Sequence, residues 1–440
     1  MIGYQVYVRS FRDGNLDGVG DFKGLTEALG YLKELSVNLV WLMPVFSSIT
    51  FHGYDVVDFK RFKAEYGTKE DFLELLKVFH DNGIKVVLDF PIHHTSILHE
   101  WFQRALRGEK RYRDYYVWAD EGTNTNETRD WDGERIWHPS ESGYYRGLFG
   151  PFTPDLNFAN PEVVKEMRKI TVELLEMGID GFRFDAAKHM RDTLEENVAF
   201  WKEFLDGLKG FFIAEVWADP EVVDAHGEIF GHMLNFDLSY CVKDAVSRED
   251  PRVLADSITR SLTARRYVSL NFTSNHDMNR LASFSDGMDI RKMKLVFSLL
   301  FTLPGIPVIF YGDELGMRGI FSRPHTDLVL DPFPWEERMC SIGQTFWKWP
   351  TFNDPFSGIS VDYQKRLEDS LFNHVVRWAR FRGENAWIDG AEVRDLRIEG
   401  KVLCYNLSGE GRELRVCHNF SNGWEIFEGV RLGPFGSEVM

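Results

Sequence analysis

The sequence predicts a closed (β/α)₈ barrel, the TIM barrel, with a subdomain inserted after the third strand and a C-terminal antiparallel β domain. Eight short apolar runs that indicate buried strands alternate with amphipathic helix patterns. The alternation breaks over residues 99–157, and after residue 390 it gives way to short runs separated by Gly, Ser and Asn. A closed barrel is favoured over an open doubly wound sheet, because no GxGxxG motif follows the first strand.

The expected barrel strands are short, apolar and bounded by turn residues, as buried parallel strands usually are. They are Tyr4–Val8, Asn38–Met43, Lys85–Phe90, Gly181–Phe184, Phe211–Glu215, Leu234–Asp237, Val268–Phe272 and Val308–Tyr311. Helical periodicity between them predicts helices over Leu25–Leu35, Lys69–His80, Pro161–Met177, Leu194–Leu208 and Arg291–Phe301.

Three domains follow from this pattern. The barrel is expected over residues 1–98 and 158–390. The aromatic-rich segment 99–157 is expected to be an inserted subdomain, because a structureless loop of that length is uncommon in a compact protein. Residues 391–440 are expected to form the β domain, with strands at Lys401–Leu407, Glu413–Asn419 and Trp424–Phe427.

The composition excludes several classes of partner. Among 440 residues, 51 are basic and 68 acidic, and a net charge of −17 argues against nucleic acid and anionic membranes. The longest apolar stretch, Leu295–Tyr311, contains Pro304 and Pro307 and does not resemble a membrane span. With no signal-peptide pattern at the start, a cytoplasmic location is expected. Only four Gln among many Glu, Lys and Arg favour a thermophile.

Aromatic residues are abundant, with 13 Trp, 15 Tyr and 36 Phe. They suit a ligand with flat apolar faces, although a ring-rich core remains the alternative for most of them. The four cysteines, by contrast, show no CxxC spacing, so neither a zinc site nor a disulfide framework is expected. Cys404 and Cys417 flank a predicted hairpin and would be near each other, but both are expected to be reduced packing residues.

Acidic residues end three of the predicted strands. Asp185 closes the fourth strand, Glu215 closes the fifth, and Asp277 follows the seventh. Because the chemistry of a βα barrel occurs at the carboxyl ends of its strands, the three can converge on one mouth. A single acid there is more often a helix N-cap, and a structural ion pair is the alternative for the set.

The surroundings of two acids predict different roles for them. Arg183 and Asp185 are two residues apart on a strand and therefore share a face, which favours an ionised Asp185 suited to act as a nucleophile. Glu215 follows four apolar residues, and these surroundings favour the protonated carboxyl of a proton donor. Such a pair, about 5–5.5 Å apart, is the arrangement of a retaining glycosidase.

Several motifs resemble the α-amylase family of glycoside hydrolases and transglycosidases. Besides the strand ends, including Asp89-Phe90-Pro91-Ile92-His93-His94, the matching motifs are Gln5–Phe11, His52-Gly53-Tyr54-Asp55, Pro154-Asp155-Leu156-Asn157 and Gly305–Gly312. The resemblance covers essentially the whole chain. It implies the same fold, with Asp185 as nucleophile, Glu215 as general acid/base and Asp277 as transition-state stabiliser.

The resemblance also implies residues that bind substrate. Tyr54 would stack on the sugar before the scissile bond, and His94, Arg183 and His276 would contact that sugar. The pair Lys188-His189 is typical of family members that act on α-1,4-glucans, although a solvated helix face is the alternative. Trp131 and Trp217 are the rings expected beneath donor or acceptor sugars, and Trp131 could instead belong to the subdomain core.

The expected activity is a retaining double displacement on α-1,4-glucans and maltooligosaccharides. A segment of one glucan would be moved to the 4-hydroxyl of another, because a hydrophobic acceptor site favours sugar over water. A hydrolase of the same family, either an α-amylase or a maltodextrin hydrolase, is the first alternative. A non-catalytic glucan-binding protein is the second. No obligate protein partner is evident.

Calcium is the expected cofactor. Asp13, Asn15, Asp17, Val19 and Asp21 occupy positions 1, 3, 5, 7 and 9 of a loop that resembles the first part of an EF-hand. The closing Glu is absent, because Gly24 stands in its place, and a simple turn is the alternative. The resemblance implies calcium here, as in related α-glucosidases. It makes a second family site doubtful, since His93 stands where an Asn ligand is usual.

Overall fold

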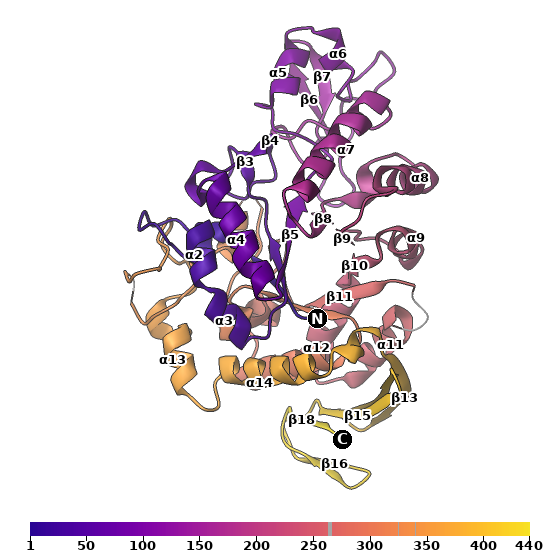
Figure 1. The fold of residues 1–440 in the computed structure, drawn as a ribbon. Helices are drawn as coiled ribbons and strands as arrows, with labels where there is room; N and C mark the ends of the chain where they lie inside the picture. Colours follow the sequence, from indigo (N-terminus) through magenta and orange to yellow (C-terminus); the bar gives the residue numbers. More distant parts are fainter. Residues whose placement is uncertain (263–265, 324, 339) are drawn as a thin grey trace. The chain divides into compact units, whose positions relative to one another are not determined.

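A computed structural model describes residues 1–262, 266–323, 325–338 and 340–440. Its strands form a closed barrel in the order β1-β12-β11-β10-β9-β8-β5-β2, which confirms the expected fold class (Figure 1). The barrel strands are β1 (Gly3–Val6), β2 (Leu39–Leu42), β5 (Lys85–Phe90), β8 (Gly181–Phe184), β9 (Phe211–Ala214), β10 (His232–Leu234), β11 (Val268–Phe272) and β12 (Ile306–Phe310).

The chain divides into two compact units, which are described in turn. The first comprises Met1–Trp41, Lys77–Lys85 and Gly231–Met440, and the second comprises Leu42–Leu76 and Val86–Phe230. Helices of the first unit are α1 (Val8–Phe11), α2 (Phe22–Glu27), α3 (Leu29–Glu34), α10 (Phe236–Arg248), α11 (Pro251–Leu262), α12 (Ile290–Thr302), α13 (Val361–Arg366) and α14 (Leu371–Glu384).

Several predictions in the first unit are wrong in detail, and the strand expected over Tyr4–Val8 ends at Val6, before α1 begins. The single helix expected over Leu25–Leu35 begins earlier and is broken at Ala28 into α2 and α3. Its early start has a clear cause, because the Asp21 carboxylate accepts a hydrogen bond from Gly24 N (2.7 Å) and caps α2. The strand expected over Leu234–Asp237 ends at Leu234, because Asn235 caps α10 through Leu238 N (3.1 Å).

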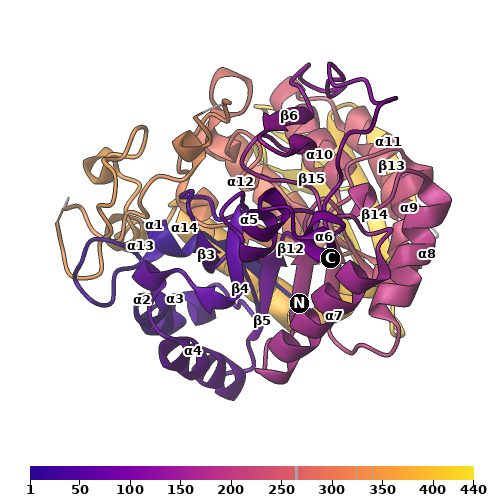
Figure 2. The same cartoon turned by 90° about the horizontal axis from the view of Figure 1, so that it is seen from above.

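The second unit contains β8 and β9 and its own set of helices. They are α4 (Lys69–Asp81, which crosses into the first unit), α5 (Glu100–Leu106), α6 (Lys110–Arg113), α7 (Pro161–Glu176), α8 (Leu194–Leu205) and α9 (Pro220–Phe230). Figure 2 shows α7, α8 and α9 following one another in chain order. As the strand period predicts, Phe184 of β8 packs on a helix, with its ring 4.9 Å from that of Trp201 in α8.

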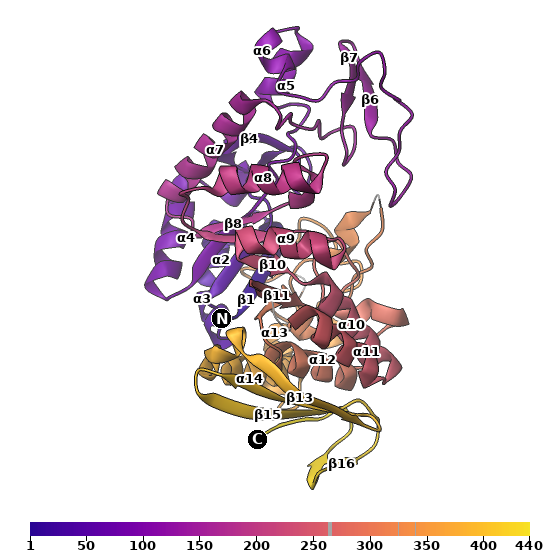
Figure 3. The same ribbon diagram turned by 90° about the vertical axis from the view of Figure 1, so that its right-hand side faces the viewer.

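Residues 99–157 contain regular structure of their own. Helices α5 and α6 accompany the hairpin of β6 (Trp137–Ser140) and β7 (Gly143–Arg146), and all four elements gather in one region of the second unit (Figures 1 and 3). Ile136, Trp137 and Leu148 form a small core there. A second hairpin in the same unit pairs β3 (Phe46–Ser48) with β4 (Val56–Phe62).

The C-terminal residues form antiparallel sheets, as expected. One sheet has the order β13-β14-β15-β18 and the other pairs β16 with β17. Their bounds are β13 (Glu392–Glu399), β14 (Val402–Gly409), β15 (Arg412–Asn419), β16 (Glu425–Phe427), β17 (Val430–Leu432) and β18 (Ser437–Val439). The larger sheet lies against α11 and α12 (Figure 3). Thr302, at the end of α12, hydrogen-bonds with the hydroxyl of Tyr405 in β14 (2.9 Å).

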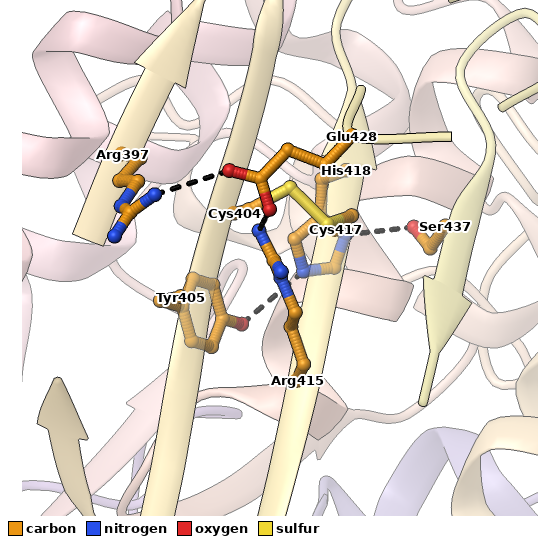
Figure 4. Close-up of a disulfide and its surroundings, with 8 residues drawn as sticks. All are labelled: Arg397, Cys404, Tyr405, Arg415, Cys417, His418, Glu428 and Ser437. Atoms are coloured by element: carbon orange, nitrogen blue, oxygen red, sulfur yellow. Dashed lines mark hydrogen bonds and ion pairs between the residues drawn. A yellow bond between two sulfur atoms is a disulfide. The ribbon is translucent and has the colours of Figure 1, made fainter. Parts of the chain in front are cut away.

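The prediction of reduced cysteines at 404 and 417 is wrong, because the structure joins them in a disulfide (Figure 4). The cause is the register of β14 and β15, which places Cys404 directly opposite Cys417 with 4.2 Å between their Cα atoms. Both residues are buried in a small core with Val402, Phe427 and Leu432. In the described part of the chain, no helix is long and apolar enough to cross a membrane.

Candidate active site

In the second unit, the guanidinium of Arg183 in β8 contacts three carboxylates. Nη1 lies 2.5 Å from Asp89 Oδ1 and 2.7 Å from Asp185 Oδ1, and Nη2 lies 2.6 Å from Glu215 Oε1. Asp89 and Arg183 are fully buried, whereas the side chains of Asp185 and Glu215 are 13% and 16% exposed. The predicted pairing of Arg183 with Asp185 is confirmed, and Asp185 and Glu215 are the two acids that solvent can reach.

Strand pairing brings these residues together. Parallel pairing sets Asp89 beside Arg183 and Phe184 beside Ala214, so Asp185 and Glu215 follow the ends of adjacent strands. Gly181 permits this close pairing, because a Cβ there would lie 2.0 Å from the carbonyl oxygen of Phe211. The position of both acids therefore follows from the sequence of β8 and β9.

The backbone after β8 holds Glu215. Ala186 is in the left-handed region with φ of 50°, and its N–H donates to Glu215 Oε2 (3.1 Å). The next residue, Ala187, donates its N–H to the carbonyl oxygen of Glu215 (3.1 Å). A non-glycine residue in this conformation costs about 1–3 kcal/mol and is typical of functional sites. The strained turn fixes the direction of the Glu215 carboxyl.

Asp89 was not a candidate in the sequence analysis, although the motif around it was noted. Its Oδ2 accepts a hydrogen bond from the Tyr54 hydroxyl (2.9 Å), so it holds Tyr54 and Arg183 together. Burial raises the pKa of Asp89 to about 6, against the opposing effect of Arg183. No clear signal for this role was available in the sequence, because the pairing of Asp89 with Arg183 on the next strand appears only in the register of the sheet.

Two predicted sugar-contacting residues lie beside this cluster. His94 Nε2 donates to the carbonyl oxygen of Tyr54 (3.1 Å), so Tyr54 and His94 are in direct contact. Burial lowers the pKa of His94 to about 4, and the imidazole is therefore neutral at pH 7. A neutral ring can still exchange hydrogen bonds with a sugar hydroxyl, and it adds no charge beside Arg183.

The residues expected around the acceptor also gather in the second unit. Lys188 Nζ donates to the carbonyl oxygen of Trp217 (2.7 Å), and the Trp217 side chain is about half exposed. Trp131, also about half exposed, has its ring 6.0 Å from that of His189. Burial lowers the pKa of His189 to about 4, so it too is neutral at pH 7. Trp131 and Trp217 keep exposed faces on which a sugar could stack.

Asp277 and His276 belong to the first unit and follow β11. The Asp277 backbone N–H donates to Asn275 Oδ1 (2.9 Å), and Asp277 Oδ2 lies 3.1 Å from His276 Nε2. Gln5 Nε2 donates to His276 Nδ1 (2.9 Å), which assigns the proton of the ring to Nε2, facing Asp277. The side chain of Asp277 is 42% exposed. Its arrangement relative to Asp185 and Glu215 stays a prediction.

The residues of the predicted calcium loop are held by hydrogen bonds within the loop. Asp13 accepts from Leu16 N (2.7 Å) and Gly18 N (2.7 Å), and Asp17 accepts from Val19 N (2.8 Å). Burial raises the pKa of Asp21, and the charges of Asp13 and Asp17 raise it further. Over the described residues, no group of three or more His, Cys, Asp or Glu side chains is arranged to hold a metal ion.

At the second calcium site of the family, which the sequence made doubtful, the Asp155 carboxylate is already surrounded by other groups of the protein. His93 Nδ1 lies 3.5 Å from the buried carboxylate of Asp155, and Arg146 Nε lies 3.6 Å from the same carboxylate. Leu148 N also donates to Asp155 (3.1 Å). The guanidinium of Arg146 would repel a calcium ion bound to Asp155, and the imidazole of His93 is a poor ligand for calcium. These residues do not fit calcium.

The site allows nucleophilic substitution at the anomeric carbon of a sugar. Two carboxyl groups on adjacent strand ends, both in contact with one buried guanidinium, can supply a nucleophile and a proton donor. The neutral histidines and the half-exposed indoles suit an uncharged ligand with apolar faces. The site therefore fits a retaining reaction on a carbohydrate.

Comparisons with known proteins identify the family of this chain. A family model described as the alpha-amylase catalytic domain matches residues 5–390. The 4-alpha-glucanotransferases of Thermotoga neapolitana and Thermotoga maritima are 63% and 62% identical to this chain, each over 100% of both chains. Alpha-amylase 3 of Dictyoglomus thermophilum is 36% identical over 96% of this chain and 84% of its own length.

Solved structures give the same assignment. The crystal structure of an alpha-amylase from H. orenii has a TM-score of 0.90 and 34% identity, covering 100% of this chain and 98% of that one. The matched model covers residues 5–390 and so includes Asp185, Glu215 and Asp277. By family model, by sequence and by structure, this chain belongs to the α-amylase family.

Proposed function

We propose that the chain is a 4-α-glucanotransferase, which moves a segment of an α-1,4-glucan to the 4-hydroxyl of another glucan. The observation that carries the proposal is the Arg183 cluster, which presents Asp185 and Glu215 on adjacent strand ends. Relatives bearing that name are 62–63% identical over the full length of the chain. Maltooligosaccharides are the substrates that this activity requires.

The proposed mechanism is a double displacement. Asp185 attacks the anomeric carbon while Glu215 gives its proton to the departing glycosidic oxygen, which leaves a covalent glycosyl-Asp185 ester. Glu215, now ionised, takes the proton of an incoming 4-hydroxyl, whose oxygen attacks the same carbon and releases Asp185. Asp277 stabilises the positive charge that develops on the sugar. Arg183 Nη1 donates a hydrogen bond to Asp185 Oδ1 (2.7 Å) and holds this carboxylate in place for the first step.

The remaining residues bind the two glucans. Tyr54 stacks on the sugar that reacts, and His94, Arg183 and His276 hydrogen-bond with it. On the acceptor side, the Lys188 ammonium holds the backbone of Trp217. The Trp217 and Trp131 rings bind the apolar faces of sugars, with His189 next to Trp131. Covered in this way, the site favours a sugar hydroxyl over water as the attacking group.

Incubation with maltotetraose tests the proposed activity. A transferase yields a ladder of longer and shorter chains, a hydrolase yields only shorter ones, and a glucan-binding protein leaves the substrate unchanged. Asp185→Asn should lower the rate by at least ~10³-fold while the melting temperature stays close to that of the wild type. Asp206→Asn, at an exposed position away from the cluster, is the matched control. Substantial disproportionation by Asp185→Asn would contradict the assignment.

We infer that calcium binds the loop of residues 13–21. The donor chemistry supports this, because three carboxylates, the Asn15 amide oxygen and the Val19 carbonyl oxygen are the hard ligands that calcium prefers. The negative charges of Asp13 and Asp17 both raise the pKa of Asp21, so a cation would relieve their mutual repulsion. When bound, calcium would stabilise the loop, and it takes no part in the sugar chemistry.

We propose a cytoplasmic location in a thermophile. Disulfides are rare in the cytosol of mesophiles but occur in intracellular proteins of hyperthermophiles, so the Cys404–Cys417 bond is compatible with both parts of this proposal. Cell fractionation with an antibody to the chain tests the location. Recovery from the medium or the envelope fraction would contradict it.

A further inference from the structure

A second group of exposed rings lies in the first unit and includes no residue of the proposed mechanism. The Trp349 side chain is 74% exposed and that of Phe346 is 54% exposed. Both line one pocket, together with Pro332, Pro334 and Pro350. These five residues are called the Trp349 platform. A single exposed ring is common on protein surfaces, whereas two exposed rings that line one pocket together with three prolines form a contiguous apolar patch, which is typical of a binding site.

The chain on either side of Trp349 is anchored to a buried carboxylate. Asp331 is fully buried, and its Oδ2 accepts hydrogen bonds from Thr351 N (2.8 Å) and Phe352 N (2.9 Å). Lys348 Nζ lies 3.1 Å from the other oxygen of the same carboxylate. On the other side, Phe346 N donates to the carbonyl oxygen of Gly18 (2.8 Å). The exposed indole is thus presented by an ordered backbone, and little conformational entropy would be lost on binding.

The platform is connected to the segment that carries Asp277. Phe321 N donates to Asn279 Oδ1 (2.8 Å), two residues beyond Asp277. The Asn353 side chain then joins the segment of Arg318 to the Asp331 carboxylate beneath the platform. Its Oδ1 accepts a hydrogen bond from Arg318 N (2.7 Å), and its Nδ2 donates to Asp331 (2.9 Å). Both segments leave the carboxyl ends of neighbouring strands, β11 and β12. The platform therefore belongs to the same end of the barrel as the proposed transition-state stabiliser.

The chemistry of the platform favours an uncharged ligand with flat apolar faces. Its walls are aromatic rings and prolines, and the charge of Lys348 is compensated by Asp327 (3.0 Å) and Asp331. The exposed guanidinium of Arg338 also lines the pocket and can donate hydrogen bonds to hydroxyl groups. Indole and phenyl rings with a few donors suit the apolar face and the hydroxyls of glucose, whereas a polyanion would need several cations and Arg338 is a single one.

We propose that the Trp349 platform is a second glucan-binding site, which holds long α-1,4-glucan chains outside the site of reaction. It takes its ligand class from the proposed function, but it uses none of the residues that act on the scissile bond. The platform retains a polymer near the barrel mouth between successive transfers. A long chain can occupy the platform and the reacting site at the same time, whereas a short oligosaccharide has too few glucose units to gain from both.

Native gel electrophoresis in the presence of soluble amylose measures this binding. Asp185→Asn is the parent, so that the polymer is not consumed during the run. Adding Trp349→Ala should weaken amylose retardation about tenfold, because one stacking ring is lost. Trp349→Phe keeps a flat ring and should restore most of the retardation. Trp424→Ala removes a comparably exposed indole (62%) from the C-terminal region and should have no effect.

The outcomes separate this proposal from the function on which it rests. Equal retardation of the Trp349→Ala and parent proteins, with unchanged melting temperatures, would overturn the second site while leaving the maltotetraose result untouched. A fall in molecular mass by sedimentation on Trp349→Ala would also overturn it, because the platform would then be an interface between protein copies. With Asp185 intact, Trp349→Ala should lower kcat/KM for amylose several-fold more than for maltotetraose. Equal losses on both substrates would contradict the proposal.

Discussion

Asp89 Oδ1 lies 2.5 Å from Arg183 Nη1, and neither side chain is exposed. The buried pair supports the two solvent-accessible acids, since the same guanidinium also contacts Asp185 and Glu215. A buried arginine can be left charged here because three carboxylates surround it. The charge balance around the reacting acids thus depends also on Asp89, which contacts the same guanidinium from the buried side.

Replacing Asp89 tests this dependence. Asp89→Asn removes a charge from a buried pair, and we expect the free energy of unfolding to fall by about 3–5 kcal/mol. We also expect kcat to fall by about 10–100-fold, because Tyr54 and Arg183 lose their common partner. Denaturant unfolding and maltotetraose kinetics give the two quantities. Asp81→Asn, on the exposed end of α4, is the control, and an Asp89→Asn enzyme with wild-type kcat would contradict the role of the pair.

The buried carboxyl of Glu314 should make the free energy of unfolding depend on pH. It is fully buried, accepts a hydrogen bond from the Tyr4 hydroxyl (2.7 Å) and another from the Tyr31 hydroxyl, and adjoins the charged Asp313. Burial raises its pKa from 4.5 to about 7. A raised acid pKa means that the folded state binds the proton more tightly. The contribution to stability is therefore complete below pH 4.5 and lost as the pH rises through about 7.

From pH 4.5 to above about pH 7, we expect the free energy of unfolding of the wild type, measured relative to Glu314→Gln, to fall by about 3 kcal/mol. Urea unfolding at half-unit steps of pH measures this difference. The control is Glu74→Gln, at an exposed position on α4, which should run parallel to the wild type. A constant difference between wild type and Glu314→Gln across the range would show that Glu314 titrates normally.

Calcium removal should lower the stability of the wild type. At a calcium concentration 100-fold above the dissociation constant, the bound ion adds about 2.7 kcal/mol, and this stabilisation disappears with a chelator. Asp17→Asn removes one ligand charge and should reduce the difference between melting temperatures with calcium and with chelator. Native mass spectrometry gives the number of ions bound. Identical melting of the wild type in both conditions, with no calcium in the native mass, would refute the loop assignment.

Trp217 should decide how often water replaces sugar as the acceptor. Its backbone is held by Lys188 and its half-exposed ring offers a surface for the acceptor. Trp217→Ala should lower the ratio of transfer to hydrolysis about tenfold, because the acceptor loses a stacking ring and water gains access. Chromatography of the products from maltotetraose gives the ratio. Trp424→Ala should leave it unchanged, and an unchanged ratio in Trp217→Ala would exclude the ring from the acceptor site.

The fold could be predicted because the strands and the helices differ clearly in period. The errors arose where one side chain overrides that period. Asn235 ends a strand by capping the next helix, and Asp21 starts α2 three residues before the apolar pattern begins. The Cys404–Cys417 bond could not be predicted, because a shift of one residue in the hairpin register would place the two sulfurs on opposite faces.

The site was predictable to a different degree in each unit. Asp185 and Glu215 stand at strand ends, where position in the sequence fixes position in the barrel. Asp89 was missed because an acid inside a buried strand gives no signal of its own until its partner across the sheet is known. The exposure of Trp349 depends on a long irregular segment anchored by Asp331, and no periodicity in that segment indicates which ring faces solvent.

The register of β14 and β15 favours re-formation of the Cys404–Cys417 disulfide after reduction. The two residues face each other in an antiparallel pair whose register extends from Val402–Asn419 to Gly409–Arg412, and the surrounding sheet does not depend on the sulfurs to keep that register. After reduction, each thiol would therefore remain at a high effective concentration of the other, and reoxidation would need no conformational search. Because both sulfurs are buried in the core with Val402, Phe427 and Leu432, a reductant reaches the bond only when this part of the sheet opens locally.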